Sequence, residues 1–210
     1  MEQRCVIIGA SPETDTVGWQ EMMREDDTVF CADGGYLWSQ KAGLVPQVII
    51  GDFDSSEYPS AAECEVLRFP VKKDDTDTMI CIKEGLKRGF RQFLLLGMTG
   101  GRPDHTFANY TALYYLVKHG AEGTMIGGRW QYNAVSDGTM TLNGRKGCSF
   151  AVFPFGCEEC CVSLSGFLYE GNNLTLSADF PLGVSNTVAD DTAVVRVKGS
   201  AILMTSLRNE

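Results

Sequence analysis

Two aspartates, Asp52 and Asp54, stand two positions apart directly after an apolar run in the segment VIIGDFDSS, residues 48–56. In extended chain such residues point to the same side and lie about 7 Å apart. Repulsion and loss of water both oppose a pair of carboxylates at the end of a buried strand, unless a positive charge lies between them. A metal ion, an arginine or water molecules could hold the pair, and the other loops of the chain bear on which it is.

Three further loops are rich in acidic, basic or glycine residues. They are DGG after residues 28–32, KKDDTDT at 72–78 and GMTGGRPDH at 97–105. Taken together, these loops suit metal-assisted transfer at phosphate, because Mg²⁺ prefers one or two carboxylates together with water and phosphate oxygens. The candidate residues in them are Asp33, Gly34, Gly35, Lys73, Thr76, Asp77, Gly100, Gly101, Arg102, Asp104 and His105.

The roles follow from the residue types. Arg102 and Lys73 supply positive charge, and the glycines let backbone N–H groups approach a phosphate closely. An acid that binds no metal could accept a proton from an alcohol nucleophile. The sequence leaves open which acid that is.

Each loop by itself has a simpler interpretation. DGG is a common turn, Asp75 or Thr76 could only cap a helix, and His105 at the start of a helix is typical of a structural hydrogen-bonding residue. GGRPDH has neither the Walker spacing nor G-x-G-x-x-G. The functional interpretation therefore rests on the four loops together.

The first 127 or so residues alternate strand and helix patterns. Continuous apolar runs predict strands at 4–10, 28–33, 48–52, 91–97 and 123–128. Apolar residues at positions 79, 82 and 86 predict a helix over 76–89, and those at 107, 110, 114 and 117 predict another over 104–120. A short helix is expected after residue 35, closed by Gly43. Runs without polar alternation favour a parallel, Rossmann-like α/β sheet with the four loops at its carboxyl edge.

After Trp130 the pattern changes to short strands separated by the turn sequences NG, KG, EGNN and KGS. We therefore expect two domains. Residues 1–130 form an α/β domain, and residues 131–210 form an all-β sandwich.

Composition narrows the possible partners. The formal net charge of −9 argues against nucleic acid or an anionic membrane as the main partner. No apolar run reaches the roughly 18 residues that cross a bilayer, and the apolar start is too short for a signal peptide. We expect a cytoplasmic protein. The eight cysteines, including the segment CEECC at 157–161, fit free thiols better than zinc, because no second Cys or His pair accompanies the single C-x-x-C.

The ordered set of motifs resembles thiamine pyrophosphokinase. GDFDS, K-x-x-T-D and GGR-x-DH occur in that order, DGG precedes them, and the tail GFLYEGNNLTL…FPLGVSN resembles the family's β-domain. The resemblance covers nearly the whole chain. It implies Mg²⁺-dependent transfer of the pyrophosphoryl group of ATP to thiamine, giving thiamine diphosphate and AMP. It also implies a homodimer with thiamine between the subunits.

The resemblance assigns residue roles. Asp52, Asp54 and Asp77 would hold Mg²⁺ on the ATP phosphates, Arg102 and Asp104 would orient the phosphates and the attacking hydroxyl, and His105 would support their loop. Ser185 and Asn186 of the partner subunit would reach the aminopyrimidine ring of thiamine. Family members commonly carry an acid after Ser-Asn, whereas this chain has Thr187.

Three alternatives stay open. A related kinase could act on another alcohol. A phosphatase of the haloacid-dehalogenase type also uses D-x-D, although on its first strand. A regulator with a lapsed site would bind nucleotide or thiamine without turnover.

Overall fold

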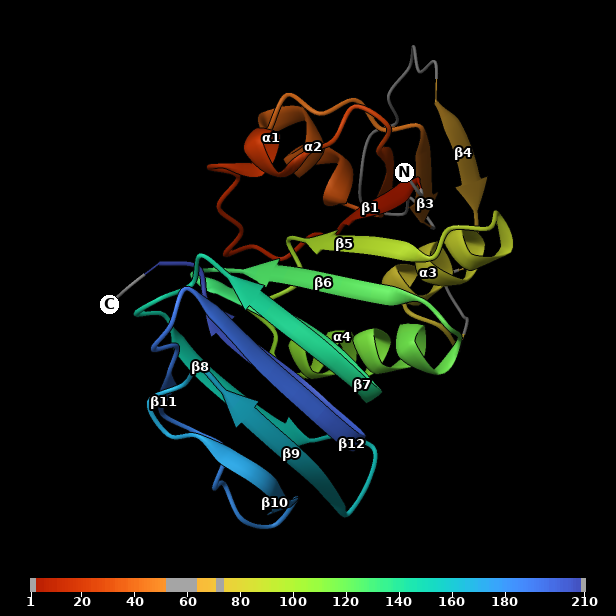
Figure 1. Cartoon of the computed structure of the whole chain (residues 1–210). Helices are drawn as coiled ribbons and strands as arrows, with labels where there is room; N and C mark the ends of the chain where they lie inside the picture. Colours follow the sequence, from red (N-terminus) through yellow and green to blue (C-terminus); the bar gives the residue numbers. More distant parts are fainter. Residues whose placement is uncertain (1–2, 52–63, 71–73, 209–210) are drawn as a thin grey trace. The chain divides into compact units, whose positions relative to one another are not determined.

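The structure is a computed structural model that describes residues 3–51, 64–70 and 74–208 of the chain. It separates into two compact units. Unit 1 comprises Met1–Ala112 and His119–Gly128, and unit 2 comprises Leu113–Lys118 and Arg129–Glu210. Each unit contains strands of its own: in Figure 1, β1 to β6 of unit 1 run from red to green, and β7 to β12 of unit 2 run from blue-green to blue.

A parallel sheet forms the centre of unit 1. The last four residues of β1, Cys5–Ile8, are fully buried, as expected for a strand covered on both faces. The parallel pairing expected from the continuous apolar runs is therefore present. In spatial order the strands are β6 (Glu122–Gly127), β5 (Gln92–Leu96), β1 (Arg4–Ile8), β2 (Thr28–Ala32), β3 (Val48–Gly51) and β4 (Glu65–Arg68).

Two short elements of unit 1 were not expected. Strand β4 lies at the edge of the sheet and has no continuous apolar run, since its outer residues Glu65 and Arg68 are exposed. Helix α1 (Trp19–Met22) has four residues, too few to show a helical period. Local pattern is weakest for elements of this length.

Three longer helices connect the strands: α2 (Gly35–Lys41), α3 (Asp77–Lys87) and α4 (Pro103–Lys118). Helices α1 and α2 lie in the connections from β1 to β3, and α3 lies in the connection from β4 back to β5. Because these connections run across the sheet in opposite directions, right-handed crossovers place their helices on opposite faces of the sheet. Figure 1 shows α1 and α2 together on one side and α3 on the other. None of the helices in the described ranges is long and apolar enough to cross a membrane.

The buried side of α4 differs from the expected one. The predicted apolar positions include Phe107, which is 63% exposed, whereas Ala112, Leu113 and Leu116 are buried together with the polar Asn109. The helix itself was predicted correctly. The predicted buried side was wrong because it relied on the aromatic positions. A large ring can lie at the surface, whereas small residues allow close packing.

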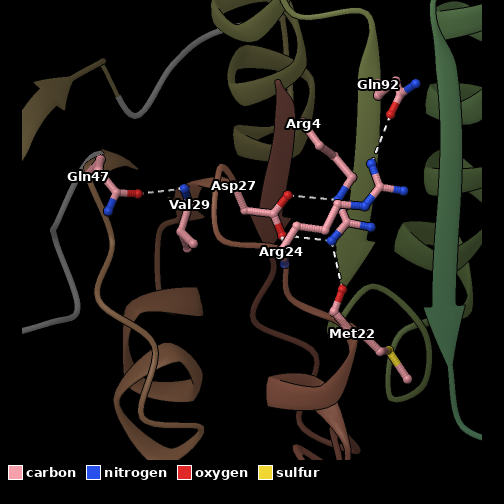
Figure 2. Close-up of polar contacts among 7 residues, drawn as sticks. All are labelled: Arg4, Met22, Arg24, Asp27, Val29, Gln47 and Gln92. Atoms are coloured by element: carbon pink, nitrogen blue, oxygen red, sulfur yellow. Dashed lines mark hydrogen bonds and ion pairs between the residues drawn. The ribbon is translucent and has the colours of Figure 1, made fainter. Parts of the chain in front are cut away.

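An ion pair joins the amino ends of β1 and β2 (Figure 2). The guanidinium of Arg4 donates to both carboxylate oxygens of Asp27, at 2.9 and 2.6 Å, and also to the carbonyl of Met22 at 2.7 Å. Asp27 is almost completely buried, with 1% of its side chain exposed. Arg24 extends the network through its backbone N–H to Asp27 and its guanidinium to Gln92. This network lies at the amino ends of the strands, whereas the predicted site lies at their carboxyl ends.

Unit 2 is built from antiparallel strands. Strand β12 pairs with β7 along one side, and on its other side with β9 in its first half and β8 in its second. The core of the unit lies between these strands and includes Phe150, Val162 and Val195. The strands are β7 (Trp130–Asn143), β8 (Ser149–Pro154), β9 (Glu159–Ser165), β10 (Gly171–Ser177), β11 (Asn186–Thr187) and β12 (Thr192–Ser206).

The expectation of short strands throughout unit 2 was wrong for β7 and β12, which have 14 and 15 residues. The sequence Lys198-Gly199-Ser200 is not a turn between two strands. It is a bulge inside β12, where the register to β7 shifts between Val197 and Ser200. Gly199 has a φ of 88°, and a glycine with that φ belongs equally to a tight turn or to a bulge. The local sequence therefore did not distinguish the two.

All eight cysteines are free thiols. Cys157 and Cys160 of the CEECC segment pack in the core of unit 2, and burial raises the pKa of Cys160 to about 11. Among the described residues, no group of three or more His, Cys, Asp or Glu side chains could hold a metal ion. CEECC therefore contributes apolar packing in unit 2.

Candidate functional site

A cavity of about 290 Å³ opens in unit 1. Its walls are the segments that follow β1, β2 and β5 and the starts of α3 and α4. Strands β1 and β5 are neighbours in the sheet. On the β1 side the sheet continues through β2 and β3 to β4, and on the β5 side it continues to β6, so the strand order reverses between β1 and β5. Ligands of open parallel sheets bind at such a switch point, at the carboxyl ends of the strands.

The cavity brings together residues that the sequence analysis drew from three separate loops. Asp33 comes from the end of β2, Thr76 and Asp77 from the start of α3, and the others from the loop between β5 and α4. The predicted residues that line it are Asp33, Thr76, Asp77, Gly100, Arg102 and His105.

A fourth wall was missed by the sequence analysis. The loop after β1, residues 9–12, lines the cavity and packs on the segment after β5. The Ser11 backbone N–H donates to Gly97 at 3.1 Å, and its hydroxyl donates to the carbonyl of Thr99 at 2.5 Å. The signal that could have found this loop is its place: it follows the first strand, which in doubly wound sheets lies at the switch point.

The loop GMTGGR after β5 turns sharply because it contains glycines. Gly100 has a φ of 95°, and a Cβ there would lie 2.6 Å from the Glu13 carboxylate. Its backbone N–H donates to the hydroxyl of Thr106 at 3.3 Å. Gly101 also has a positive φ of 67°, but it is exposed and does not line the cavity. The conformation of Gly100 brings its backbone close to a ligand in the cavity.

Arg102, which lines the cavity, forms a bidentate ion pair with Asp104. The guanidinium donates to the two carboxylate oxygens at 3.2 and 2.6 Å. Hydrogen bonding from Arg102 lowers the pKa of Asp104, and the same bond raises the pKa of Arg102. Both side chains are more than half exposed, so the pair contributes little to stability and both groups remain accessible to a ligand.

The DGG segment places Asp33 beside the end of β3. Asp33 has a φ of 45°, and its backbone N–H donates to Ile50 at 2.7 Å. A Cβ on Gly51 would lie 3.1 Å from the Asp33 carboxylate, so Asp33 lies against the residue that precedes Asp52 in the chain. Gly34 and Gly35 do not line the cavity. A Cβ on Gly35 would lie 2.0 Å from the carbonyl oxygen of Ile8, so this position admits only glycine.

The segment before α3 divides into structural and cavity-lining residues. Thr76 is the N-cap of α3, and its hydroxyl accepts the backbone N–H of Met79 at 3.2 Å. Asp75 pairs with Lys83 at 2.7 Å and does not line the cavity. Asp77 does line it. The capping interpretation is therefore correct for Thr76, which nevertheless also borders the cavity.

Three predicted residues, Asp52, Asp54 and Lys73, lie outside the described residues. The described acids at the cavity are Asp33 and Asp77, and their oxygen donors are of the type that Mg²⁺ prefers. This donor chemistry fits a divalent cation at the cavity.

The two residues predicted to contact thiamine differ in their environment. Ser185 is exposed and has a φ of 62°. Asn186 is 7% exposed, and its Oδ1 accepts the backbone N–H groups of Tyr169 and Thr187 at 3.0 and 2.8 Å. Its Nδ2 donates to the carbonyl of Tyr169 at 2.8 Å. The amide of Asn186 is therefore used to hold the Tyr169 loop, whereas Ser185 lies at the surface.

Known proteins with similar sequences are thiamine pyrophosphokinases. The chain is 26% identical over 160 residues to thiamine pyrophosphokinase of Bacillus subtilis, covering 73% of this chain and 75% of that protein. It is 27% identical over 176 residues to thiamin pyrophosphokinase 1 of Caenorhabditis elegans, covering 78% and 71%.

Solved structures show the same fold. The crystal structure of the Bacillus subtilis enzyme matches with a TM-score of 0.86 at 23% identity, covering 99% of this chain and 100% of that one. Thiamin pyrophosphokinase from Candida albicans matches with a TM-score of 0.82 at 14% identity, covering 99% and 90%.

Two family models match consecutive parts of the chain. The vitamin B1 binding domain of thiamin pyrophosphokinase matches residues 139–202. The catalytic domain matches residues 19–125, which is just over half of the 210 residues and includes most of the loops around the cavity. The protein belongs to the thiamin pyrophosphokinase family.

Proposed function

We propose that the chain is a thiamine pyrophosphokinase. The hydroxyethyl oxygen of thiamine attacks the β-phosphorus of ATP, the bond from that phosphorus to the α,β-bridging oxygen breaks, and AMP leaves. The observation that carries this proposal is the cavity at the switch point, which gathers the DGG, T-D and GGR loops in a chain of this family.

The cavity suits the phosphates of ATP. Its volume of about 290 Å³ is at the low end for ligand pockets, so we assign to it the polyphosphate and the adjoining part of the nucleoside of ATP rather than both complete substrates. Arg102 provides the positive charge and Asp104 aims its guanidinium, while the backbone of Gly100 lines the cavity and Gly101 follows it in the same loop. We assign Lys73, Thr76 and His105 to the same phosphate environment.

Asp52, Asp54 and Asp77 would hold Mg²⁺, with Asp33 and the DGG turn beside them. The bound cation would neutralise charge on the phosphates and lower the repulsion that an incoming oxygen meets. The residues of the chain itself would bind and align the polyphosphate, Arg102 directly and the acids through the cation.

Thiamine recognition is assigned to the β-rich unit. Ser185 would contact the aminopyrimidine ring from the partner subunit of a homodimer, and Asn186 would support it by holding the Tyr169 loop. We infer that residues 1–130 act as a Rossmann-like ATP-binding catalytic domain and residues 131–210 as a β-sandwich for thiamine binding and dimerisation. The free cysteines fit a reducing compartment, and we place the protein in the cytoplasm.

The test is an assay of the purified protein with ATP, Mg²⁺ and thiamine, with products resolved by chromatography. We expect AMP and thiamine diphosphate in equal amounts, with loss of both on addition of EDTA. ADP with thiamine monophosphate would instead indicate a kinase that attacks the γ-phosphorus. Phosphate release without thiamine would indicate a phosphatase, and binding of ATP without any product would indicate a regulator.

A further inference from the structure

Asn109 is a buried polar residue at the cavity that has no assigned role in the proposed reaction. It lies on α4, is 8% exposed and lines the cavity. Its Nδ2 donates to the backbone carbonyl of Met98 at 2.7 Å. Asn109 therefore connects α4 to the segment after β5.

This hydrogen bond fixes the orientation of the amide. A backbone carbonyl only accepts hydrogen bonds, so the side-chain atom facing Met98 must be the nitrogen. Oδ1 is then the other terminal atom, and no described residue donates a hydrogen bond to it. Oδ1 is not one of the fully buried unpaired oxygens among the described residues, so it is open to the cavity, where a ligand donor or water completes its hydrogen bond.

Met98 is itself restrained through its side chain. The Thr78 hydroxyl lies 3.6 Å from the Met98 sulfur, and a Cβ on Gly9 would lie 2.7 Å from that sulfur. Contacts from the start of α3 and from the loop after β1 thus restrain Met98, which is 3% exposed. Because its partner is restrained, the direction of Asn109 Oδ1 is restrained as well.

The chemistry of Oδ1 limits what it can bind. An amide oxygen is an acceptor, and phosphate oxygens at neutral pH are acceptors too, so it does not suit the polyphosphate. ATP carries donors in its nucleoside part, namely the two ribose hydroxyls and the amino group of adenine.

We propose that Asn109 is a specificity-determining residue whose Oδ1 accepts a hydrogen bond from the nucleoside part of ATP, a ribose hydroxyl or the adenine amino group. This inference rests on the proposed function, because it takes ATP as the nucleotide. Its Nδ2 meanwhile positions Met98. Asn109 acts in substrate choice, which distinguishes it from the charged residues that hold the phosphates.

The experiment compares ATP with three analogues that each lack one donor: 2′-deoxy-ATP, 3′-deoxy-ATP and purine riboside triphosphate. Their dissociation constants are measured by calorimetry in the presence of Mg²⁺, and kcat/KM is measured with thiamine. We expect the wild type to bind one analogue about tenfold more weakly than ATP, the size of one hydrogen bond. In Asn109→Leu that ratio should fall to about one, because the acceptor is gone.

Thr111→Val is the matched control. Thr111 lies on the same helix outside the cavity, and within the described part of the chain its hydroxyl donates only to the carbonyl of Phe107. This variant should keep the wild-type ratio. Asn109→Ser is the second variant should Asn109→Leu fail to fold, since it is smaller and polar. Its shorter hydroxyl does not reach the same position, so it should also lose the discrimination.

Two results would overturn the proposal. One is a wild type that binds all three analogues as well as ATP. The other is an Asn109 variant that weakens all nucleotides equally and keeps the wild-type ratio, which is what a purely structural role through Met98 predicts. The calorimetric ratio needs no turnover, so failure of the proposed pyrophosphokinase reaction would be seen separately, as absence of AMP and thiamine diphosphate.

Discussion

Neighbouring acids in this chain have different surroundings. Asp77 lines the cavity at the start of α3, whereas Asp75, two residues earlier, pairs with Lys83 at the surface. The two carboxylates have the same chemistry and nearly the same place in the sequence. They are therefore a matched pair for separating a functional acid from a solvated one.

We expect Asp77→Asn to lower kcat at least about 100-fold, because a neutral amide weakens metal binding and the charge stabilisation that depends on it. Asp75→Asn should retain activity within about twofold, since it removes only an exposed ion pair. Steady-state assays of both variants test this, with circular dichroism to verify folding. Equal losses in the two variants would remove Asp77 from the metal site.

Ser185 and Asn186 are adjacent but should respond differently to substitution. Asn186→Ala leaves the backbone N–H groups of Tyr169 and Thr187 without their acceptor, so we expect about 1–3 kcal/mol lower free energy of unfolding. Ser185→Ala should leave stability nearly unchanged and raise the KM for thiamine more than that for ATP. Urea unfolding and two-substrate kinetics measure these effects. A Ser185 variant with equal changes in both KM values would contradict the assignment to thiamine.

At the scale of elements, close backbone contacts determine how the loops meet. Helix α2 begins at Gly35, directly against the carbonyl of Ile8 at the end of β1. This contact sets the position of the DGG turn relative to the central strand. Because the requirement for glycine is steric, it applies to Gly35 and not to Gly34.

Gly35→Ala should lower the free energy of unfolding by about 3 kcal/mol, because its Cβ would overlap backbone that cannot move aside. Gly34→Ala is the matched comparison. Gly34 has a φ of −58°, and an added Cβ would lie 3.2 Å from the Cβ of Ala10. We expect it to cost about 1 kcal/mol or less. Chemical denaturation of both variants decides the matter, and equal stabilities would show that α2 shifts to accommodate the methyl group.

The amino ends of β1 and β2 are held together by a buried ion pair instead of by close backbone packing. Arg4→Met leaves the buried carboxylate of Asp27 without its guanidinium partner, so we expect a loss of about 3–5 kcal/mol. The double variant Arg4→Met/Asp27→Leu removes both charges and should recover much of that loss. Thermal and urea unfolding measure the difference. A double variant less stable than Arg4→Met would mean that the other contacts of Asp27 carry the effect.

At the scale of the whole molecule, the two family models match different halves of the chain. The catalytic model ends at residue 125 and the vitamin B1 binding model begins at residue 139. If thiamine lies between subunits, a complete site takes its acids from one chain and Ser185 from another. Two inactive variants can then complement each other.

We expect a mixture of Asp77→Asn and Ser185→Arg, refolded together, to regain about one quarter of wild-type activity. With random pairing half of the dimers are mixed, and each mixed dimer contains one intact site. Light scattering coupled to gel filtration should show a dimer. Activity equal to the sum of the separately refolded variants would place both residues in the same subunit's site or exclude exchange, and a monomer would refute the shared site.

The sequence by itself determined the order of the longer strands and helices of the first half, all but α1 and β4, because buried parallel strands need continuous apolar runs and the loops carried glycines or acids. It also indicated the family, through motifs that occur in a fixed order. The bulge at Gly199 and the length of β12 could not be predicted, since a glycine with positive φ serves turns and bulges alike. Strand β4 lacked any apolar run to mark it.

Only the tertiary structure decided which side chains share the cavity. Ser11 and Thr99 are 88 positions apart in the chain, and their hydrogen bond exists because β1 and β5 pair in parallel register. Asn109 carries no motif of its own that assigns it a task, and becomes a candidate because its amide is fixed by Met98 beside the cavity. Local sequence specifies the conformation of each loop, whereas contacts between loops depend on strand order and register, which arise from packing the whole sheet.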